Sequence, residues 1–493
     1  MDNHLDGSAM NRRPHRTGTN LSLSPATRGA HICVIGAGPS GLTTLKNLLA
    51  LGLTNVVCFD SADAIGGNWV FREDQPSVHQ FTHTISSKRL SEFEDYPMPA
   101  DFPDFPSHCE VRAYLDAYAA HFGLAPFIRL KERIESATRR ADGRWSVRIA
   151  TPREIKEVDF DYLIVCSGHH RVALIPNYPG HFGGEVLHSG AFKQAAPFAN
   201  KRVLVVGGGN SACDIASEIS RVASRTCISM RRGSYILPKK MFGYPVDRLY
   251  ASFRWLPQVI SRPLFEAVLR MKVGRWRDYG LQAPRARLLE MHPTLNSNVL
   301  KALRSGAVVP RVGIARLAEN EIEFHDGIVE AFDTVIWATG FRATFPFLDA
   351  SVVDWNMAEC PPLYLKMMHR EASNLYFIGF FQPLGCIWRL ADHQARIAAL
   401  QITGYLNRPA DIVARIAREM GTRHRRFDQS SRHAIEVDYH EFRRELLAYI
   451  KTARIAPRDL HGSIWDQPGA PHQGSDIGKI VVRRLESSNA HGV

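Results

Sequence analysis

The chain has 493 residues, of which 45% are hydrophobic and 22% are charged, and its formal net charge is +12 at pH 7. This length and balance are typical of a globular protein with more than one hydrophobic core, so two or more domains are expected. No apolar run reaches the length of a membrane span, so no transmembrane segment is expected. The eight cysteines include no C-x-x-C pair, so neither a disulfide framework nor a metal site is indicated.

Residues 1–29 are polar and lack the apolar core of a signal peptide. They predict a disordered tail and a cytoplasmic location. The positive charge raises the question of a nucleic-acid partner. The arginines are spread along the chain, however, and no basic run is interleaved with stacking aromatic residues. A solvated surface and the phosphates of bound cofactors are therefore favoured over nucleic acid.

A glycine-rich motif comes after the tail. HICVIG (31–36) has strand composition and TTLKNLLALG (43–52) has helical spacing, so Gly36, Gly38 and Gly41 lie on a strand-to-helix turn. Such glycines let a pyrophosphate approach the helix N-terminus, where free N–H groups and the helix dipole favour anions. NVVCFD (55–60) predicts the next strand and places Asp60 at its end, 24 residues after Gly36. A carboxylate there accepts hydrogen bonds from a ribose, so the spacing predicts a dinucleotide-binding fold.

Three segments carry a family resemblance: GAGPSGL (36–42), FDSADAIGGNW (59–69) and DFPDFPSHCEVRAYLDAYAAHFGL (101–124). Together they resemble the flavin-containing monooxygenase family, and the likeness extends over about residues 30–450. The resemblance implies an α/β fold with two Rossmann-like dinucleotide-binding domains, in which an NADPH domain interrupts an FAD domain. It implies FAD binding by Gly36, Gly38, Pro39, Ser40, Gly41, Asp60, Gly67, Asn68 and Trp69, although Trp69 is also suited to core packing. Thioredoxin-reductase-like flavoproteins share this plan but need a redox-active cysteine pair, which the sequence lacks.

A second glycine motif lies in the middle of the chain. KRVLVV (201–206) predicts a strand and CDIASEIS (213–220) a helix, with Gly207, Gly209, Asn210, Ser211 and Ala212 on the turn between them. Arg231 comes 24 residues after Gly207, so it is interpreted as the equivalent of Asp60, and Arg232 comes next. Guanidinium groups bind a 2′-phosphate that an acid would repel, so the pair favours NADPH over NADH. The alternative is a surface arginine pair without a ligand.

Between the two motifs, FGGEVLHSGAF (182–192) is similar to the flavin-containing monooxygenase fingerprint F-x-G-x-x-x-H-x-x-x-(Y/F). Phe182, Gly184, His188 and Phe192 fill its positions. The related fingerprint of Baeyer–Villiger monooxygenases ends in Trp and then Pro or Asp, whereas Phe192 precedes Lys193. The match therefore favours oxygenation of a heteroatom. His188 is interpreted as an organiser between domains and not as a general base.

Two strand-like segments, FDYLIVCSGHH (160–170) and FDTVIWATGFRATFP (332–346), predict where the chain leaves and re-enters the FAD domain. In the second, Asp333, Ala338, Thr339, Gly340 and Pro346 match a pattern of the same superfamily, with Ala338, Thr339 and Gly340 as cofactor-binding candidates. The predicted order is a tail (1–29), the first part of the FAD domain (30–197), the NADPH domain (198–332), the second part of the FAD domain (333–460) and a tail or arm (461–493). Gln382, in a turn after NLYFIGFF (374–381), is a candidate flavin contact by the resemblance.

The resemblance also implies the reaction. NADPH reduces FAD, O2 adds at the flavin C4a atom, retained NADP+ shields the (hydro)peroxide, and a soft nucleophile (an amine nitrogen or sulfur of a small molecule) takes one oxygen atom. Family members commonly place an Asn near this group, three residues before a lysine, but here Ile85 stands at that distance from Lys88. His83 and Ser86 are the candidate catalytic residues in its place, with Ser87 nearby. Alternatively, these polar residues only end a strand.

Other interpretations remain open. The chain could be a Baeyer–Villiger monooxygenase acting on a ketone, an uncoupled NADPH oxidase, or a nucleotide-binding regulator without catalysis. Residues 241–276 are aromatic and basic, and could form a lid, a membrane-surface face or an ordinary amphipathic packing segment. The residues do not identify the substrate. They also leave the oligomeric state open, and a homo-oligomer is one of the alternatives.

Overall fold

The computed structural model describes residues 24–252, 258–284, 287, 288, 290, 293–353, 361–383, 385–423 and 435–455. The predicted C-terminal tail or arm (461–493) and most of the predicted N-terminal tail lie outside these residues. The last part of the N-terminal tail departs from the prediction of disorder, because Pro25–Gly29 form a short helix, α1. Ser24 caps this helix by accepting a hydrogen bond from the Thr27 N–H at 3.1 Å, and Pro25 suits its first turn.

The first unit of the α/β fold is built on a seven-stranded mixed sheet, ordered β22-β23-β24-β7-β1-β2-β3. Strands β24, β7, β1, β2 and β3 pair in parallel, and β22 and β23 extend the edge in antiparallel fashion. Every residue of β1 is buried, as expected for a central strand covered on both faces. The strands are β1 (Ile32–Ile35), β2 (Val56–Asp60), β3 (Ile128–Leu130), β7 (Tyr162–Val165), β22 (Leu363–Tyr364), β23 (Met368–His369) and β24 (Leu375–Phe377).

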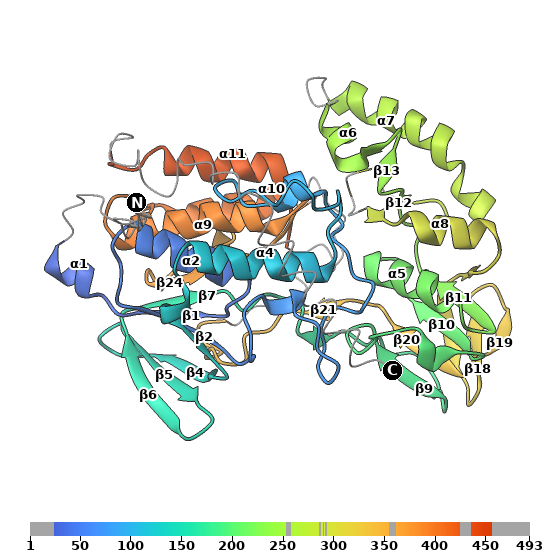
Figure 1. Ribbon diagram of the computed structural model, residues 1–493, viewed down its shortest axis with the longest axis horizontal. Coiled ribbons are helices and arrows are strands. Elements are labelled where there is room, and N and C mark those ends of the chain that lie inside the picture. Colours follow the sequence, from blue (N-terminus) through green and yellow to red (C-terminus); the bar gives the residue numbers. More distant parts are fainter. Residues whose placement is uncertain are drawn as a thin grey trace, which may run out of the picture.

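Helices cover one face of this sheet and a small antiparallel sheet covers the other (Figure 1). The helices on this side are α2 (Pro39–Ala50), α4 (His108–His121), α9 (Ile387–Ile402), α10 (Ile412–Arg423) and α11 (Tyr439–Ile450), of which α11 lies on the outer side of α9. The small sheet comprises β4 (Arg133–Arg139), β5 (Trp145–Ala150) and β6 (Ile155–Phe160). Shorter elements of this unit are η1 (Gly67–Trp69), α3 (Lys88–Ser91), η2 (Ala125–Phe127), β25 (Gln382–Pro383) and β26 (Glu436–Val437).

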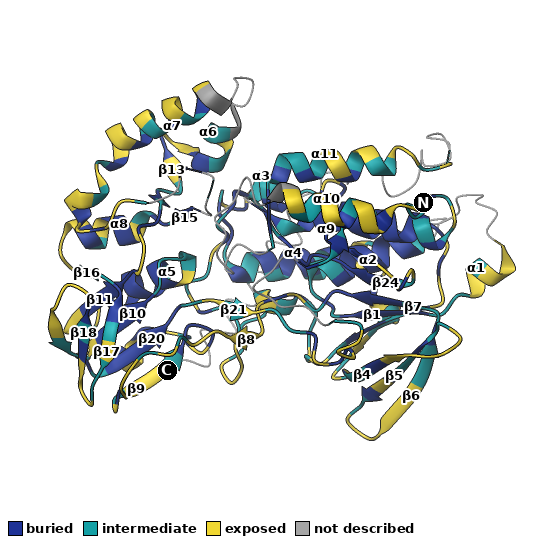
Figure 2. Ribbon diagram, turned by 180° about the vertical axis from the view of Figure 1, so that it is seen from behind, coloured by how far each residue is buried: buried dark blue, intermediate teal, exposed yellow. Residues whose placement is uncertain are grey.

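The second unit is built on a five-stranded sheet, ordered β16-β11-β10-β20-β9, whose pairs are all parallel. Its strands are β9 (Glu185–His188), β10 (Arg202–Val206), β11 (Arg225–Ser229), β16 (Val309–Arg311) and β20 (Thr334–Trp337). One face is covered by α5 (Asn210–Ile219), and the same hydrophobic core continues outward to α8 (Ser297–Arg304) and α7 (Gln258–Val273). The other packs against β17 (Ile314–Leu317), β18 (Glu321–Phe324) and β19 (Val329–Ala331). Figure 2 shows the buried strands of both sheets beneath partly exposed helices.

The two units repeat one plan, because each runs strand, helix, strand and then a three-stranded antiparallel insertion before a strand that returns beside the first. The strand pairing corrects the predicted boundaries of the middle domain, 198–332. Strands β9 and β20 lie outside that range, yet β20 pairs with β10, and β9 pairs with β20. The fingerprint segment therefore supplies an edge strand of the second sheet.

The two connections between the units run side by side. Strand β8 (Val172–Ala173) lies on the outgoing connection and β21 (Phe341–Arg342) on the returning one, and they pair in antiparallel fashion. The Thr339 hydroxyl donates to Leu174 O at 2.5 Å, and the Leu174 N–H donates to Gly340 O at 3.0 Å. The predicted crossing points thus form a short two-stranded ribbon.

The described residues between 236 and 279, which are 236–252 and 258–279, form a subdomain on the second unit. It contains β12 (Ile236–Leu237), β13 (Lys240–Met241), β14 (Tyr244–Pro245), α6 (Val246–Ser252), α7 and η4 (Trp276–Tyr279), and β12 pairs with β15 (Thr294–Leu295). In α7, Phe265, Leu269 and Val273 pack into the core of the second unit, which agrees with the packing interpretation, while Ile260 and Met271 are exposed. No helix among the described residues has the length and apolar character needed to cross a membrane.

Candidate functional site

The first glycine turn joins β1 to α2 as predicted. Gly36 has a φ of +105°, and a Cβ at this position would lie 2.6 Å from the carbonyl oxygen of Cys166. A Cβ on Gly41 would collide with the carbonyl oxygen of Gly36. Gly38 occupies the N-cap of α2 without a side-chain cap, so it leaves the first N–H groups of the helix without a capping side chain. This geometry fits a pyrophosphate at the helix N-terminus.

Asp60 ends β2 and faces the same turn. Its carboxylate accepts hydrogen bonds from the Ala37 N–H at 2.7 Å and the Ala62 N–H at 2.8 Å. These bonds fix the carboxylate while leaving lone pairs for a ribose. The adjacent turn places Gly67 against Gly38, and Trp69 lies edge-on to Trp388 of α9, with the ring centroids 5.8 Å apart. Trp69 therefore packs in the first unit, whereas Asn68 is exposed.

Gln382 lies beside the carboxyl end of β7. Its Oε1 atom is 3.4 Å from His169 Nε2, so His169 carries its proton on Nε2 in this contact. Burial lowers the pKa of His169 to about 3, which keeps the ring neutral. Cys166, Ser167 and Gly168 connect this histidine to β7, the strand next to the first glycine turn. Gln382 is thus placed at the same end of the sheet as the predicted FAD residues.

The second glycine turn repeats the first. Gly207 has a φ of +140°, and a Cβ there would collide with the carbonyl oxygen of Ala338, as one on Gly36 would with Cys166. Gly209 is the N-cap of α5, again without a side-chain cap. Asn210 is drawn inward, because its Oδ1 accepts from the Leu295 N–H at 3.0 Å, and Ser211 is exposed. Ala212 is fully buried, which explains the need for a small residue.

The strand register corrects the proposed equivalence of Arg231 and Asp60. Ile35 pairs with Phe59 in the first sheet and Val206 pairs with Ser229 in the second. Asp60 therefore corresponds to Met230, and Arg231 lies one residue further along. A count along the sequence misses this offset because the paired residues lie 24 positions apart in the first unit, Ile35 and Phe59, and 23 apart in the second, Val206 and Ser229.

Arg231 and Arg232 nevertheless lie beside the predicted nucleotide site. Both side chains are exposed at the carboxyl end of β11. Among the described residues, the Arg231 guanidinium makes no hydrogen bond or ion pair, and its charge lowers the pKa of Tyr178 against the larger effect of burial, which raises it. Tyr178 in turn stacks on Trp337 at 5.8 Å between ring centroids. A cation is therefore available for an anionic ligand.

The fingerprint residues organise the junction between the units. His188 Nε2 is 2.9 Å from Gly340 O, its Nδ1 accepts from the Gly190 N–H at 3.2 Å, and burial lowers its pKa. Phe192 is buried and meets His79 edge-on at 5.5 Å. These contacts agree with the interpretation of His188 as an organiser.

Lys193, the residue next to the fingerprint, ties it to the first unit. Its Nζ donates to Gln75 O at 2.8 Å and to the Ser77 hydroxyl at 2.7 Å. The backbone adds hydrogen bonds from Ser77 N to Gly190 O and from Gln80 N to Lys193 O. Burial lowers the pKa of Lys193 to about 8. Residues 75–80 of the first unit are therefore held by the second, a role that the sequence around Lys193 did not indicate.

The candidate catalytic residues His83 and Ser86 lie on the continuation of this segment but are not brought together by a shared contact. The His83 side chain is exposed and its Nδ1 is 2.8 Å from Phe81 O. The Ser86 hydroxyl is buried and 3.0 Å from the Ser91 hydroxyl. Lys88 Nζ donates to three backbone oxygens, those of Pro99, Ala100 and Phe102. Ser86 is therefore part of a local turn, and His83 faces solvent.

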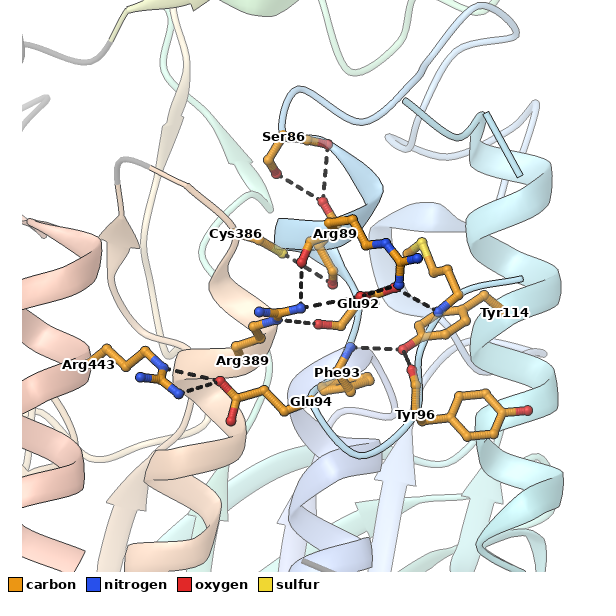
Figure 3. A network of polar contacts seen from close by, with 12 residues as sticks. Ser86, Arg89, Glu92, Phe93, Glu94, Tyr96, Tyr114, Cys386, Arg389 and Arg443 are labelled. Carbon is orange, nitrogen blue, oxygen red and sulfur yellow. Dashed lines mark hydrogen bonds and ion pairs between the residues drawn. The ribbon is translucent and has the colours of Figure 1, made fainter. Parts of the chain in front are cut away.

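A polar network joins this turn to α9 (Figure 3). Arg389, in the first turn of α9, donates to the carbonyl oxygens of Glu92 and Arg89 at 2.7 and 2.5 Å. Cys386 Sγ, just before α9, donates to Ser91 O at 3.7 Å. Further along, Glu94 pairs with Arg443 of α11 at 2.8 Å. Residues 86–94 are thus fixed next to the segment that carries Gln382.

Comparisons with known proteins place most of the chain in one family. The model of the family described as "FMO-like: Flavin-binding monooxygenase-like" matches residues 29–457. Flavin-containing monooxygenase 5 of Oryctolagus cuniculus is 35% identical over 442 residues, covering 85% of this chain and 82% of the relative. Dimethylaniline monooxygenase [N-oxide-forming] 2 of Rattus norvegicus is 34% identical over 438 residues, covering 84% and 81%.

Solved structures share the fold. S-allyl-L-cysteine S-oxygenase from Allium sativum superimposes with a TM-score of 0.66 at 20% identity, over 93% of this chain and 98% of that one. Cyclohexanone monooxygenase in its open form gives a TM-score of 0.65 at 16% identity, over 86% and 98%. At these identities the likeness concerns the fold alone.

Proposed function

Since the chain belongs to the flavin-binding monooxygenase-like family and is a monooxygenase that uses FAD and NADPH, we propose that it transfers one oxygen atom from O2 to a soft nucleophile, an amine nitrogen or sulfur, of a small molecule. The curated relatives include enzymes named for N-oxide formation, which supports this choice of acceptor. The residue after Phe192, which is Lys193 in place of Pro or Asp, supports it over insertion of oxygen into a ketone.

One observation carries the proposal. The chain contains two equivalent strand-turn-helix cradles, at Gly36 and Gly207, which differ in the residues at the end of the second strand: Asp60 in one, Met230 and the arginine pair in the other. An acid suits a ribose without a 2′-phosphate and arginines suit one with it, so FAD fits the first cradle and NADPH the second. An enzyme that must reduce a flavin and then keep the oxidised nicotinamide nearby needs both.

The proposed FAD residues are Gly36, Gly38, Pro39, Ser40, Gly41, Asp60, Gly67, Asn68, Trp69 and Gln382, and the proposed NADPH residues are Gly207, Gly209, Asn210, Ser211, Ala212, Arg231 and Arg232. Ala338, Thr339 and Gly340 lie on the returning connection between the two units. Their backbone shapes the Gly207 turn and anchors His188, which supports an indirect role in cofactor binding.

When bound in the first cradle, the flavin would supply the oxygen chemistry. The residues of the chain bind and orient the cofactors and exclude water from the site. His169, neutral at physiological pH, fixes the Gln382 amide, and Phe192 closes an apolar contact on His79. His83 and Ser86 remain the proposed hydrogen-bonding residues near Ile85, with Ser86 acting through its pair with Ser91.

The test is a product analysis. Purified holoenzyme is given NADPH, O2 and, separately, a tertiary amine, a sulfide and a cyclic ketone, while NADPH consumption and H2O2 release are recorded. We expect N-oxide or sulfoxide and little H2O2. Lactone as the main product would identify a Baeyer–Villiger monooxygenase, and H2O2 equal to the NADPH consumed with every substrate would identify an uncoupled oxidase. A colourless protein without NADPH turnover would refute the proposal altogether.

A further inference from the structure

The segment 84–87, which contains Ile85, belongs to the first unit but its backbone is held by side chains of the second. Lys239 Nζ donates to the carbonyl oxygen of Thr84 at 3.2 Å. The N–H of Ser87 donates to Asp247 Oδ2 at 2.6 Å. Lys239 therefore binds the carbonyl group just before Ile85 and Ser86, and Asp247 binds the N–H group just after them.

Lys239 and Asp247 are themselves held as a pair. They flank the hairpin of β13 and β14, and the Val246 N–H donates to Lys239 O at 3.0 Å across its base. The other carboxylate oxygen of Asp247 accepts from the Arg248 N–H at 2.8 Å. The carboxylate is thus oriented toward Ser87 by its own helix, α6.

The contact between Lys239 and Thr84 is partly shielded from solvent by the groups around Lys239. Its ammonium lies 5.3 Å from the centroid of the Phe105 ring, and burial lowers its pKa, with Asp214 of α5 opposing that shift. Thr84 is 3% exposed and Ser87 is 1% exposed. Hydrogen bonds of charged groups to such buried backbone atoms contribute more than exposed ones, because water does not compete for the partners.

The opposite side of the same segment is fixed to the first unit. Ser86 pairs with Ser91, and Ser91 O accepts from Cys386 Sγ immediately before α9 (Figure 3). The segment therefore lies between two supports: α9, next to the proposed flavin contact Gln382, and the hairpin of the second unit. Its position depends on how the two units are docked.

We propose that Lys239 and Asp247 are positioning residues that hold the Thr84–Ser87 backbone in register with the second unit, so that the nucleotide-binding unit sets the position of Ile85 during oxygen transfer. The inference rests on the proposed function, because Ile85 stands where family members commonly have an Asn near the reacting oxygen. Ile85 offers no hydrogen bond through its side chain. A fixed backbone keeps this apolar side chain in place and excludes water there.

The test uses the full-length holoenzyme with four variants. Asp247→Ala and Lys239→Met each remove one contact, and Asp247→Asn is the conservative replacement, since an amide oxygen can still accept from Ser87. Lys240→Met is the matched control. Lys240 makes an exposed ion pair with Asp104 at 2.6 Å between the same two units but no contact with residues 84–87.

Hydrogen exchange, measured by mass spectrometry on the oxidised resting enzyme, tests the two contacts of Lys239 and Asp247 with the Thr84–Ser87 backbone, here called the clamp. Asp247→Ala should speed exchange of the Ser87 amide, in peptides covering residues 84–87, about tenfold, as expected for loss of a hydrogen bond to a charged group. Asp247→Asn should restore most of the protection, and Lys240→Met should leave it unchanged. Unchanged exchange in Asp247→Ala would overturn the clamp, whether or not the enzyme oxygenates anything.

The positioning role is tested by the coupling of NADPH oxidation to substrate oxygenation, measured as H2O2 released per NADPH consumed. Asp247→Ala and Lys239→Met should release several-fold more H2O2 per NADPH than the wild type, with a nearly unchanged KM for NADPH and an unchanged flavin spectrum. Faster exchange with unchanged coupling, or equal loss of coupling in Lys240→Met, would overturn the assignment. If Lys239→Met fails to fold, the Asp247 variants decide alone. A wild type that forms no product with any substrate refutes the proposed function instead.

Discussion

Gly36 and Gly207 occupy equivalent positions at the ends of β1 and β10, and each lies against the carbonyl oxygen of the residue that follows a neighbouring strand, Cys166 after β7 and Ala338 after β20. The positive φ angles are unfavourable for any residue with a Cβ, at a cost of roughly 1–3 kcal/mol, before the collision with the carbonyl oxygen is counted. These two positions therefore offer separate control over the two nucleotides.

We expect Gly36→Ala to be purified with a lower ratio of flavin to protein, measured by absorbance. Gly207→Ala should keep its flavin but reduce it slowly with NADPH in a stopped-flow experiment. Gly421→Ala is the control, because a Cβ there meets nothing within 4 Å. If Gly207→Ala lost its flavin while Gly36→Ala kept it, the assignment of the two sites would be contradicted.

The arginine pair should decide between the two nicotinamide cofactors. Replacing Arg231 and Arg232 together by Ala should raise the KM for NADPH about 10- to 100-fold, the loss expected if the exposed pair contributes the equivalent of one charge-assisted hydrogen bond, roughly 1.5–3 kcal/mol. The KM for NADH should change far less. Arg316→Ala serves as control, because Arg316 is an exposed arginine of the same unit paired with Glu323. Equal increases for both cofactors would show that the pair does not recognise the 2′-phosphate.

The glycine turns could be predicted because their signal is local: the strand, the turn and the helix are contiguous in the sequence. The position of Arg231 was one residue off because register depends on pairing between strands, which counting from a glycine does not capture. Lys239 and Asp247 carry no signal in the sequence, since they bind backbone atoms that lie 155 and 160 residues away in the chain. The exposure of His83 and the pairing of Ser86 with Ser91 likewise depend on how the loop folds.

At the scale of elements, α2 and α9 are joined through a buried charge cluster. The Lys46 side chain is 0% exposed, and its Nζ lies 2.5 Å from Asp95 and 2.6 Å from Asp392. Asn47 also donates to Asp392 at 2.8 Å. Because α2 begins at the first glycine turn and α9 comes soon after Gln382, this cluster sets the distance between two parts of the proposed FAD site.

Removing the buried cation should destabilise the fold strongly. Lys46→Met leaves two buried carboxylates without their shared partner, a change that typically costs about 3–5 kcal/mol. Urea unfolding would measure it. Arg316→Met, which breaks an exposed ion pair, should cost no more than about 1 kcal/mol. A Lys46→Met protein as stable as the wild type would show that the cluster contributes nothing to the union of the two helices.

At the scale of the whole molecule, the sequence predicted an α/β fold and two crossings but placed the unit boundaries by motif. Motifs mark nucleotide turns, whereas boundaries depend on strand pairing, and β9 and β20 pair across long stretches of chain. A fragment of residues 198–332 would lack both strands and expose the edge of β10. We expect it to be unfolded by circular dichroism, whereas residues 175–342 should fold and bind NADP+ in a calorimetric titration. Equal folding of both fragments would contradict the corrected boundary.

The paired strands β8 and β21 have a kinetic consequence. Two chain segments hydrogen-bonded to each other resist bending and twisting more than a single linker does, so the second unit has few orientations open to it. A ligand bound in the second unit then meets the first at a high effective concentration, set by the geometry of the ribbon and not by diffusion.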